Sequence, residues 1–256
     1  MFYICNMDYH KDVERISKSG LDLINKSPLH YYDRYYNRIK EEKKTPALLM
    51  GSAIHTKVLE PDEYGKVYAV APEVDRRTKA GKADWDAFVS DHPEHEILTQ
   101  EQDALIANIH DAVYKHEQAS VLLNRLISVE QVFTHEDKKC KPDGITMQDI
   151  MIDLKTTEDA SPRGFGRSAY KYRYDVQAAW YMDILREKGH TIEGFVFIAV
   201  EKSPPYAVAC YVIEDEDVEI GRQKYQENYK TWKECKESGN WPGFGISKLQ
   251  LPNYGK

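Results

Sequence analysis

The sequence predicts an α/β fold with a mixed central sheet of about five strands, flanked by helices and preceded by a mainly helical N-terminal portion. Apolar residues recur at helical spacing in several segments of about the first 120 residues. Short runs with strand character follow between 128 and 155, and two more strands alternate with helices after residue 160. The 256 residues fit one domain, with 1–120 as the helical part and 121–256 as the α/β core and tail.

The N-terminal part contains two segments with helix signals. Residues 8–40 are rich in aromatic side chains, with Ser17 and Ser19 as candidate N-caps and Pro28 as an interruption. Residues 47–60 place leucine, isoleucine and valine on one side of a helix, which the following proline ends. Both segments therefore predict helices.

A polar, basic segment precedes the next helices. Residues 72–82 predict a loop, because they are charged and lack apolar periodicity. A short helix is expected around residues 85–89. A longer one is expected over residues 100–118, where apolar residues recur three and four positions apart.

The second half alternates strands with helices. Five runs of strand character are predicted, at residues 128–136, 139–147, 149–155, 194–202 and 206–213. The order of these strands and the helices between them gives the predicted sheet its mixed character.

The segments between and after these strands have different characters. The stretch 163–174, RGFGRSAYKYRY, is basic and aromatic, and we expect it to form a loop. A helix is predicted over residues 175–189, with Gly189 as its C-terminal stop, and a polar helix over residues 215–238. The tail from residue 241 is predicted to be extended.

Composition and charge exclude several classes of protein. Hydrophobic residues make up 41% and charged residues 30%, which is typical of a folded globular protein. The net charge of −7 excludes a uniformly basic DNA-coating protein but allows an enzyme with a local basic groove. No apolar run approaches the roughly 20 residues that span a bilayer. The N-terminal residues lack the features of a secretory signal. We therefore expect a cytoplasmic protein without a membrane partner.

The cysteines and the absence of one motif limit the cofactors. The four cysteines, Cys5, Cys140, Cys210 and Cys235, are scattered, and no CxxC pair occurs. A zinc or iron–sulfur site normally draws on closely spaced cysteines, so we expect free thiols and no iron–sulfur cluster. No G-x-x-x-x-G-K-[ST] motif occurs, so we expect no ATP-driven activity.

Two carboxylates and a lysine are predicted to converge in the segment KPDGITMQDIMIDLK. Asp153 and Lys155 follow an apolar strand and, being two residues apart, project from the same face. Asp143 reaches the same point if the preceding strand pairs with this one as a hairpin that turns at 147–149. The sequence therefore predicts an acidic site with one cation.

This combination suits magnesium-dependent phosphodiester hydrolysis. Mg²⁺ prefers oxygen ligands, which Asp143, Asp153 and the main-chain carbonyl of Leu154 provide. The ion stabilises charge on the phosphate and lowers the pKa of a bound water, and Mn²⁺ is an expected substitute. Lys155 would position that water and offset negative charge in the transition state.

Simpler interpretations exist for each of these residues. Asp143 precedes Gly144, and Asp-Gly is a common turn signal. Asp153 and Lys155 also fit a solvated, salt-bridging strand end. His55 lies among apolar neighbours, where a lone histidine is more often a core residue.

Asp143 followed by Asp153-Leu154-Lys155 resembles the signature of PD-(D/E)XK nucleases, and Pro142-Asp143 keeps the literal PD. Gln177 and Tyr181 form a Q-x-x-x-Y pair that is similar to the motif on the next helix of RecB-like and RecE-like nucleases. Further segments that resemble RecE-like phage and prophage exonucleases are GSAIHTKVLEP with His55, SPLHYY at 27–32, RRTKAGK at 76–82 and the Trp241-Pro242 ending.

The resemblance implies roles for residues outside the central motif. His55 and Glu130 would lie in the outer shell of the metal or phosphate. Gln177 and Tyr181 would orient the lysine or hold the substrate strand. By the same resemblance, the site belongs to a PD-(D/E)XK restriction-endonuclease-like core, and Asp143, Asp153 and Lys155 are its central catalytic residues.

The resemblance to RecE-like enzymes also implies an activity and partners. It predicts Mg²⁺-dependent, 5′-to-3′ exonuclease digestion of linear duplex DNA ends in a bacterial host cytoplasm. The product would be a 3′ single strand for recombination, handed to a RecT-like single-strand annealing protein. A homo-oligomer is expected, possibly a ring around DNA.

Two basic segments are candidates for DNA binding. The stretch 163–174 interleaves cations with aromatic rings, which bind phosphates and stack on bases. Its candidate residues are Arg163, Arg167, Tyr170, Lys171 and Arg173; those of the second segment are Arg76, Arg77 and Lys79. The alternative in both places is a solvated surface segment.

Two rival functions remain open at this point. One is another nuclease of the same fold, either an endonuclease or a Cas4-like DNA-processing enzyme, although the scattered cysteines disfavour the latter. The other is a catalytically silent DNA-binding or interaction protein on a nuclease scaffold. The intact set of Asp143, Asp153 and Lys155 disfavours this second rival.

Overall fold

A five-stranded mixed sheet lies at the centre of the molecule, as predicted. The computed structural model describes residue 9, residues 11–37 and residues 45–249. The strand order is β3-β6-β7-β8-β9. The central strand β7 pairs antiparallel with β6 and parallel with β8, while β8 pairs antiparallel with β9. The strands are β3 (Leu126–Val129), β6 (Gly144–Thr146), β7 (Ile150–Thr157), β8 (Gly194–Glu201) and β9 (Val208–Val212).

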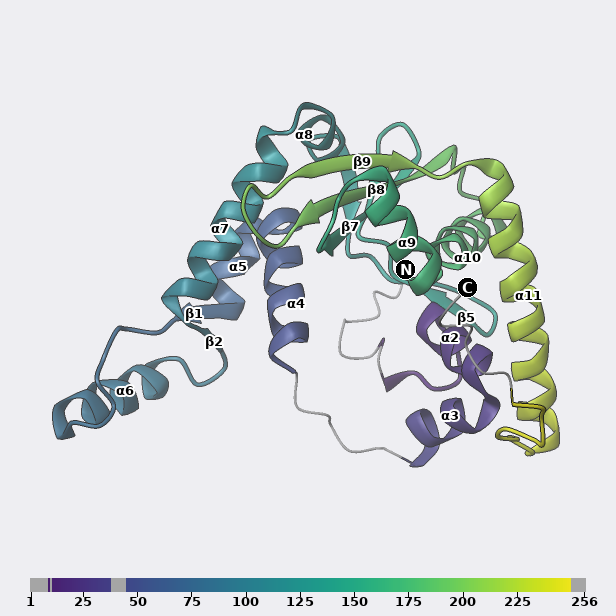
Figure 1. Cartoon of the computed structure of the whole chain (residues 1–256), viewed down its shortest axis with the longest axis horizontal. Helices are drawn as coiled ribbons and strands as arrows, with labels where there is room; N and C mark the ends of the chain where they lie inside the picture. The colour runs from purple at the N-terminus through teal and green to yellow at the C-terminus, as the bar shows by residue number, and fades with distance from the viewer. Residues whose placement is uncertain (1–8, 10, 38–44, 250–256) are drawn as a thin grey trace.

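One face of the sheet is covered by helices of the N-terminal half (Figure 1). Ile152 and Leu154 of β7 and Ile198 of β8 point to this side and are fully buried. They share a hydrophobic cluster with apolar side chains of α4 (Pro46–Leu59) and α7 (Gln100–Lys115). This packing fixes α4 against the middle of the sheet.

The opposite face is covered by helices from both ends of the chain. Met151, Phe195 and Phe197 point to this side, where they pack with apolar residues of α10. Outside α10 lie α11 and α2 (Figure 1). These helices are α10 (Tyr174–Glu187), α11 (Asp215–Ser238) and α2 (Lys18–Lys26). The strand β7 is therefore buried on both faces, which explains its almost continuous apolar sequence.

The N-terminal helix prediction is confirmed in part. Ser17 caps α2 by accepting a hydrogen bond from the Gly20 N–H at 3.3 Å, whereas Ser19 lies inside the helix. Pro28 begins a new helix, α3 (Pro28–Tyr32), which continues into the π-helical turn η1 (Asp33–Asn37). Residues 12–17 are not helical, and 38–40 lie outside the described residues.

An arm extends from the sheet on the side of α7 (Figure 1). It contains α5 (Pro61–Val67), the parallel strand pair β1 (Tyr68–Val70) and β2 (Glu96–Leu98), and α6 (Lys79–Asp91). The prediction of a loop over 72–82 is wrong for its last four residues, because Thr78 caps α6 by accepting from the Gly81 N–H at 2.9 Å. The predicted helix over 100–118 is two helices, α7 and α8 (Glu117–Leu123).

Two predicted strands are each broken into two. The strand predicted over 128–136 is interrupted at Glu130, which has a φ of 49°, and 139–147 is interrupted before Gly144. Pro142 lacks the N–H that a strand ladder needs, which explains the second break. The separated pieces, β4 (Phe133–His135) and β5 (Lys138–Cys140), form their own antiparallel hairpin.

The stretch 163–174 forms a helix instead of the predicted loop. Helix α9 (Pro162–Tyr172) begins at a proline, and the Ser161 side chain accepts from the Gly164 N–H at 3.2 Å. Two glycines at 164 and 166 lower helix propensity and masked this pattern. The predicted helices α10 and α11 and the stop at Gly189, which has a φ of 86°, are confirmed.

Two findings bear on the class of protein. Cys140, Cys210 and Cys235 are free thiols, as predicted, and Cys5 lies outside the described residues. Within the described part of the chain, none of the helices combines the length and apolar character needed to cross a membrane.

Gly221 of α11 lies against the backbone at the start of α10. A Cβ at this position would collide with the main-chain carbonyl oxygen of Asp175 and approach the amide nitrogen of Val176 to 2.9 Å. Neither backbone group can move without shifting the start of α10. This contact therefore fixes the end of α10 that lies nearest α9.

We predict that Gly221→Ala lowers the free energy of unfolding by about 1–3 kcal/mol, the usual range for overpacking a well-packed interior. The midpoint of urea denaturation measures this change. The matched control is Gly166→Ala in α9, where an added Cβ meets no atom within 4 Å. The control should be neutral or slightly stabilising, since alanine favours helix by up to about 1 kcal/mol. Equal midpoints for the two variants would contradict the proposed contact.

Candidate active site

The β6–β7 hairpin brings Asp143 and Asp153 together, as predicted. Gly144 pairs with Ile152 across the hairpin, so the preceding Asp143 lies opposite Asp153. The Leu154 N–H donates to Asp143 Oδ2 at 2.7 Å, which holds this carboxylate beside β7. The turn lies at 147–149, where the Asp149 N–H donates to the Thr146 carbonyl at 3.0 Å.

Asp153 and Lys155 project from the same face of β7 and form an ion pair. Lys155 Nζ lies 2.5 Å from Asp153 Oδ1, and Asp153 retains only 2% of its surface exposed. Gln177 of α10 donates through Nε2 to the other carboxylate oxygen, Asp153 Oδ2. The Asp153 carboxylate is therefore held between the strand and α10.

His55, Glu130 and Asp143 form a candidate metal centre. One ligand atom from each lies within 4.8 Å of the others. His55 Nδ1 lies 3.3 Å from Asp143 Oδ2 and 4.0 Å from Glu130 Oε1. His55 comes from α4, and Glu130 is held at the end of β3, where its N–H donates to the Asp143 carbonyl at 3.1 Å. Two carboxylates and an imidazole suit a divalent cation of intermediate to hard character.

The electrostatics of these three groups fit a cation. Burial raises the pKa of Asp143 well above its ordinary value, and the charges of Asp153 and Glu130 raise it further. Burial lowers the pKa of His55 below its ordinary value, which favours the neutral imidazole that binds metals. A divalent cation at this point would offset the negative charge that the fold gathers there.

Lys155 remains a cation in this environment. Burial alone disfavours its charged form, but the carboxylates of Asp153 and Asp143 outweigh burial and raise the pKa of Lys155. Its Nζ also lies 4.8 Å from the centre of the Tyr174 ring, a cation–π contact. Lys155 can therefore hold its proton and present positive charge to a bound anion.

Comparison with known proteins relates this site to one family. Residues 17–246 match the family model described as PDDEXK-like domain of unknown function (DUF3799). The chain belongs to this family. Among curated proteins, none matches the sequence.

Several solved structures are similar to this chain. A putative exonuclease from Eubacterium rectale superposes with a TM-score of 0.62 and 16% identity, covering 96% of this chain and 97% of that one. A phage-related exonuclease from Haemophilus somnus 129PT gives a TM-score of 0.40 at 12% identity, covering 88% and 96%. An alkaline exonuclease from Laribacter hongkongensis gives 0.34 at 10% identity, covering 92% and 98%. The first similarity shows the fold, and the other two are too weak structurally to support an argument.

The site of this PDDEXK-like domain includes two residues that sequence reasoning missed. Lys141 forms an ion pair with Glu130, and Tyr174 forms the cation–π contact with Lys155. Lys141 directly precedes Pro142-Asp143, and this position next to the motif is the signal that could have identified it. Tyr174 had no distinguishing signal, because the stretch before it contains several similar aromatic residues.

In the described part of the chain, Tyr181 and Leu154 do not contact the site through polar side-chain atoms, as Gln177 does. Tyr181 is 9% exposed and packs in the core, with its ring 6.5 Å from that of Phe195. Leu154 supplies its N–H to Asp143, so its observed contribution is to position a carboxylate.

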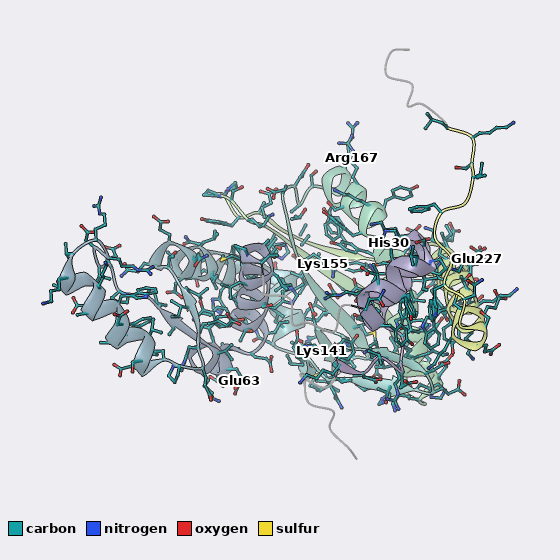
Figure 2. The ribbon with its side chains drawn as sticks, turned by 90° about the horizontal axis from the view of Figure 1, so that it is seen from below. His30, Glu63, Lys141, Lys155, Arg167 and Glu227 are labelled. Carbon is teal, nitrogen blue, oxygen red and sulfur yellow. The ribbon has the colours of Figure 1, made fainter. Side chains whose placement is uncertain are left out.

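The predicted DNA-binding residues of 163–174 divide into two groups. Arg163, Arg167, Tyr170 and Lys171 are exposed on neighbouring turns of α9. Figure 2 shows Arg167 extending from α9 away from the rest of the molecule. Arg173 instead has a left-handed backbone with a φ of 55° and a side chain that is 15% exposed.

Arg173 connects three helices at the junction of α9 and α10. Its Nη1 donates to Asp22 Oδ1 of α2 at 3.0 Å, and its Nη2 donates to Asn228 Oδ1 of α11 at 2.6 Å. Lys18 of α2 completes the junction by donating to the Tyr172 carbonyl at 2.6 Å. Because the guanidinium is engaged within the fold, we do not include Arg173 in a DNA-binding face.

The second predicted segment lies on the arm. Arg76 and Arg77 precede α6, and Lys79 begins it; all three are exposed. The Arg76 guanidinium lies 4.2 Å from the centre of the Trp85 ring, and Arg77 pairs with Asp75 at 3.0 Å. These residues belong to a separate surface, since α6 lies well away from α9 (Figure 1).

We predict that Arg173→Ala destabilises the protein by about 1–3 kcal/mol, because it removes charge-assisted hydrogen bonds to two helices. The midpoint of urea denaturation checks this. Arg167→Ala is the matched control and should leave the midpoint unchanged, since this side chain is exposed. If the Arg173 variant keeps its stability, the junction does not depend on the guanidinium.

We predict that Asp143→Asn stabilises the metal-free protein at neutral pH. The raised pKa means that folding favours protonated Asp143, so its ionised form costs stability once the pH exceeds the ordinary carboxyl value of about 3.8. The gain should disappear below that pH, where wild-type Asp143 is protonated. Thermal melting in EDTA measures the gain, at about 2–4 °C for each kcal/mol. A lower melting temperature at neutral pH would show that the carboxylate is not under electrostatic stress.

Proposed function

We propose that this PDDEXK-like protein is a divalent-metal-dependent DNA nuclease that acts as an exonuclease on linear duplex DNA. One observation supports this most strongly. The fold places the His55–Glu130–Asp143 group and the Asp153–Lys155 pair side by side on one hairpin and its neighbours. A site that joins a cation-binding group to a buried lysine fits hydrolysis of a phosphodiester.

The chain's own residues divide the work of binding and orientation. Asp143, Glu130 and His55 would hold the ion, and Asp153, opposite Asp143, is a further candidate ligand. Both Asp153 oxygens have partners: Oδ1 lies 2.5 Å from Lys155 Nζ, and Oδ2 accepts from Gln177 Nε2. A bound Mg²⁺, or Mn²⁺ in its place, would supply charge for the phosphate and a lower pKa for a water.

Lys155 would act on the phosphate and the attacking water. Its raised pKa keeps the ammonium charged at neutral pH. Positive charge at this point counts most in the transition state, where negative charge accumulates on the phosphate oxygens. Gln177 holds the Asp153 carboxylate by a hydrogen bond. Because Asp153 forms an ion pair with Lys155, Gln177 thereby also orients the lysine. Tyr174 restrains the ammonium on the side of its ring.

Finer features of the function rest on likeness to other proteins. The similarity to the putative exonuclease from Eubacterium rectale supports action from DNA ends. We further propose 5′-to-3′ polarity, a 3′ single-stranded product for recombination in a bacterial cytoplasm, and a RecT-like annealing partner, from the RecE-like sequence motifs. The same motifs support a ring-shaped homo-oligomer.

We predict Mg²⁺-dependent release of the 5′ label from linear duplexes before any 3′ label, with closed circular DNA untouched. EDTA should stop the reaction. Lys155→Met should lower the rate of hydrolysis at least about 100-fold, because it removes transition-state charge stabilisation. The same variant should retain Mn²⁺ binding in calorimetric titration, since the ligands remain.

Different outcomes would support different rivals. Rapid cutting of circles would support an endonuclease or a Cas4-like enzyme, and early loss of the 3′ label would reverse the proposed polarity. Metal-independent DNA binding without any hydrolysis would support a catalytically silent DNA-binding protein. Normal activity of a folded Lys155→Met protein would remove the proposed site itself.

A further inference from the structure

An aromatic cavity lies beside the candidate active site, between α9, β9 and the first half of α11. Its volume is about 400 Å³, and it is partly open to solvent. The lining combines aromatic and aliphatic side chains with a few charged ones, from Phe165, Gly166, Ala169, Tyr170, Tyr174, Phe197, Tyr211, Val212, Ile220, Asp175, Asp217 and Lys224. No role in the proposed hydrolysis accounts for this cavity.

Flat aromatic faces form its walls. The rings of Phe165 and Tyr211 are stacked, with centres 4.9 Å apart, and those of Tyr174 and Phe197 are stacked at 5.3 Å. Tyr170 stands at the rim with 83% of its surface exposed. Phe165 and Phe197 are only 3% exposed, so the aromatic surface open to a ligand comes from Tyr170 and from the half-buried Tyr174 and Tyr211. Aromatic surface of this kind stacks on an unpaired nucleobase regardless of its identity.

The cavity lies next to the candidate catalytic residues, and Tyr174 belongs to both. Asp153 of β7 pairs in register with Phe197 of β8, which in turn pairs with Tyr211 of β9. The three side chains therefore lie in one row across the sheet, and neighbouring strands are about 4.8 Å apart. The backbone of Tyr211 is thus roughly 10 Å, two strand spacings, from that of Asp153. The Tyr174 ring contacts Lys155 and also lines the cavity.

The charges around the cavity would orient a nucleotide. Arg163, Arg167 and Lys171 are exposed on α9 and attract phosphates. On the opposite wall Lys224 is paired with Asp175, whereas Asp217 and the acidic first turn of α11 repel phosphates. A strand would therefore run along α9 with its base turned into the cavity.

Asp175 and Lys224 add a charged pair to the lining. Asp175 Oδ2 accepts a hydrogen bond from Lys224 Nζ at 2.5 Å. The Lys224 ammonium also lies 6.0 Å from the centre of the Tyr170 ring, so a cation stands beside the exposed aromatic ring at the rim.

We propose that this cavity receives an unpaired base of the DNA strand that is being cut. This inference rests on the proposed nuclease function and adds a base-holding subsite next to the cleaved phosphate. Holding a separated base would keep the end of the duplex open between cleavage steps. The site would accept any base, since stacking dominates its walls.

Filling the cavity tests the proposal. Gly166→Leu adds a side chain to the lining where a Cβ meets no atom within 4 Å, and Gly166→Ala is the matched control. Binding is measured in EDTA, so that no DNA is cleaved, with linear duplexes that carry a short single-stranded 5′ extension. A parallel series replaces each nucleotide of the extension in turn by an abasic one. Wild-type protein should bind about tenfold more weakly when the base that enters the cavity is missing.

Gly166→Leu should bind the intact extension about tenfold more weakly than wild type does. This variant should bind the abasic extensions with the same affinity as the intact one. Gly166→Ala should behave as wild type. If Gly166→Leu binds every DNA as wild type does, the cavity is not a base site, and a protein partner becomes its better occupant. If no abasic position weakens wild-type binding, the inference is also wrong. Mg²⁺-dependent digestion by wild type, measured separately, shows whether the nuclease proposal itself stands.

Discussion

The negative charge that the β6–β7 hairpin gathers is the constraint on which the rest of the structure depends. Asp143 and Asp153 lie side by side with 8% and 2% of their surfaces exposed. Ionised carboxylates at such depth are costly unless hydrogen bonds and cations surround them. The Leu154 N–H, Gln177 and Lys155 each supply part of this compensation. Burial and the neighbouring carboxylates of Asp153 and Glu130 nevertheless raise the pKa of Asp143, so its ionised form stays disfavoured.

The remaining parts of the site are held by packing across the whole domain. His55 reaches Asp143 only because α4 is fixed against the sheet through Ile152, Leu154 and Ile198. Gln177 reaches Asp153 because α10 packs on the opposite face. The hairpin alone can therefore form the acid–lysine group, whereas the candidate metal centre requires both halves of the chain. The candidate metal centre therefore depends on the helical N-terminal portion as well as on the sheet.

The difference between a local group and one built by both halves of the chain explains what could be predicted from the sequence. Asp143, Asp153 and Lys155 were predicted to meet because side chains in strands alternate with a period of two and the hairpin is local. The helix α9 was missed because its glycines disguise a helix that capping by Ser161 and packing of Phe165 stabilise. The partners of Lys141 and Tyr174 could not be predicted, since they depend on how distant elements approach one another. For the same reason Arg173 looked like a DNA-binding residue, although it connects three helices.

The distribution of charge matters more than its sum for the proposed substrate. A net charge of −7 would oppose binding to a polyanion if it acted as a whole. At physiological ionic strength, however, exposed charges are screened beyond about 8 Å. DNA that approaches α9 therefore responds mainly to Arg163, Arg167 and Lys171, while the acidic start of α11 lies on the far side of the aromatic cavity. The acidic residues of the site face inward, where they attract a cation that a bound phosphate can share. A protein with a negative net charge can thus attract DNA phosphates to α9. From there the DNA strand could reach the β6–β7 hairpin.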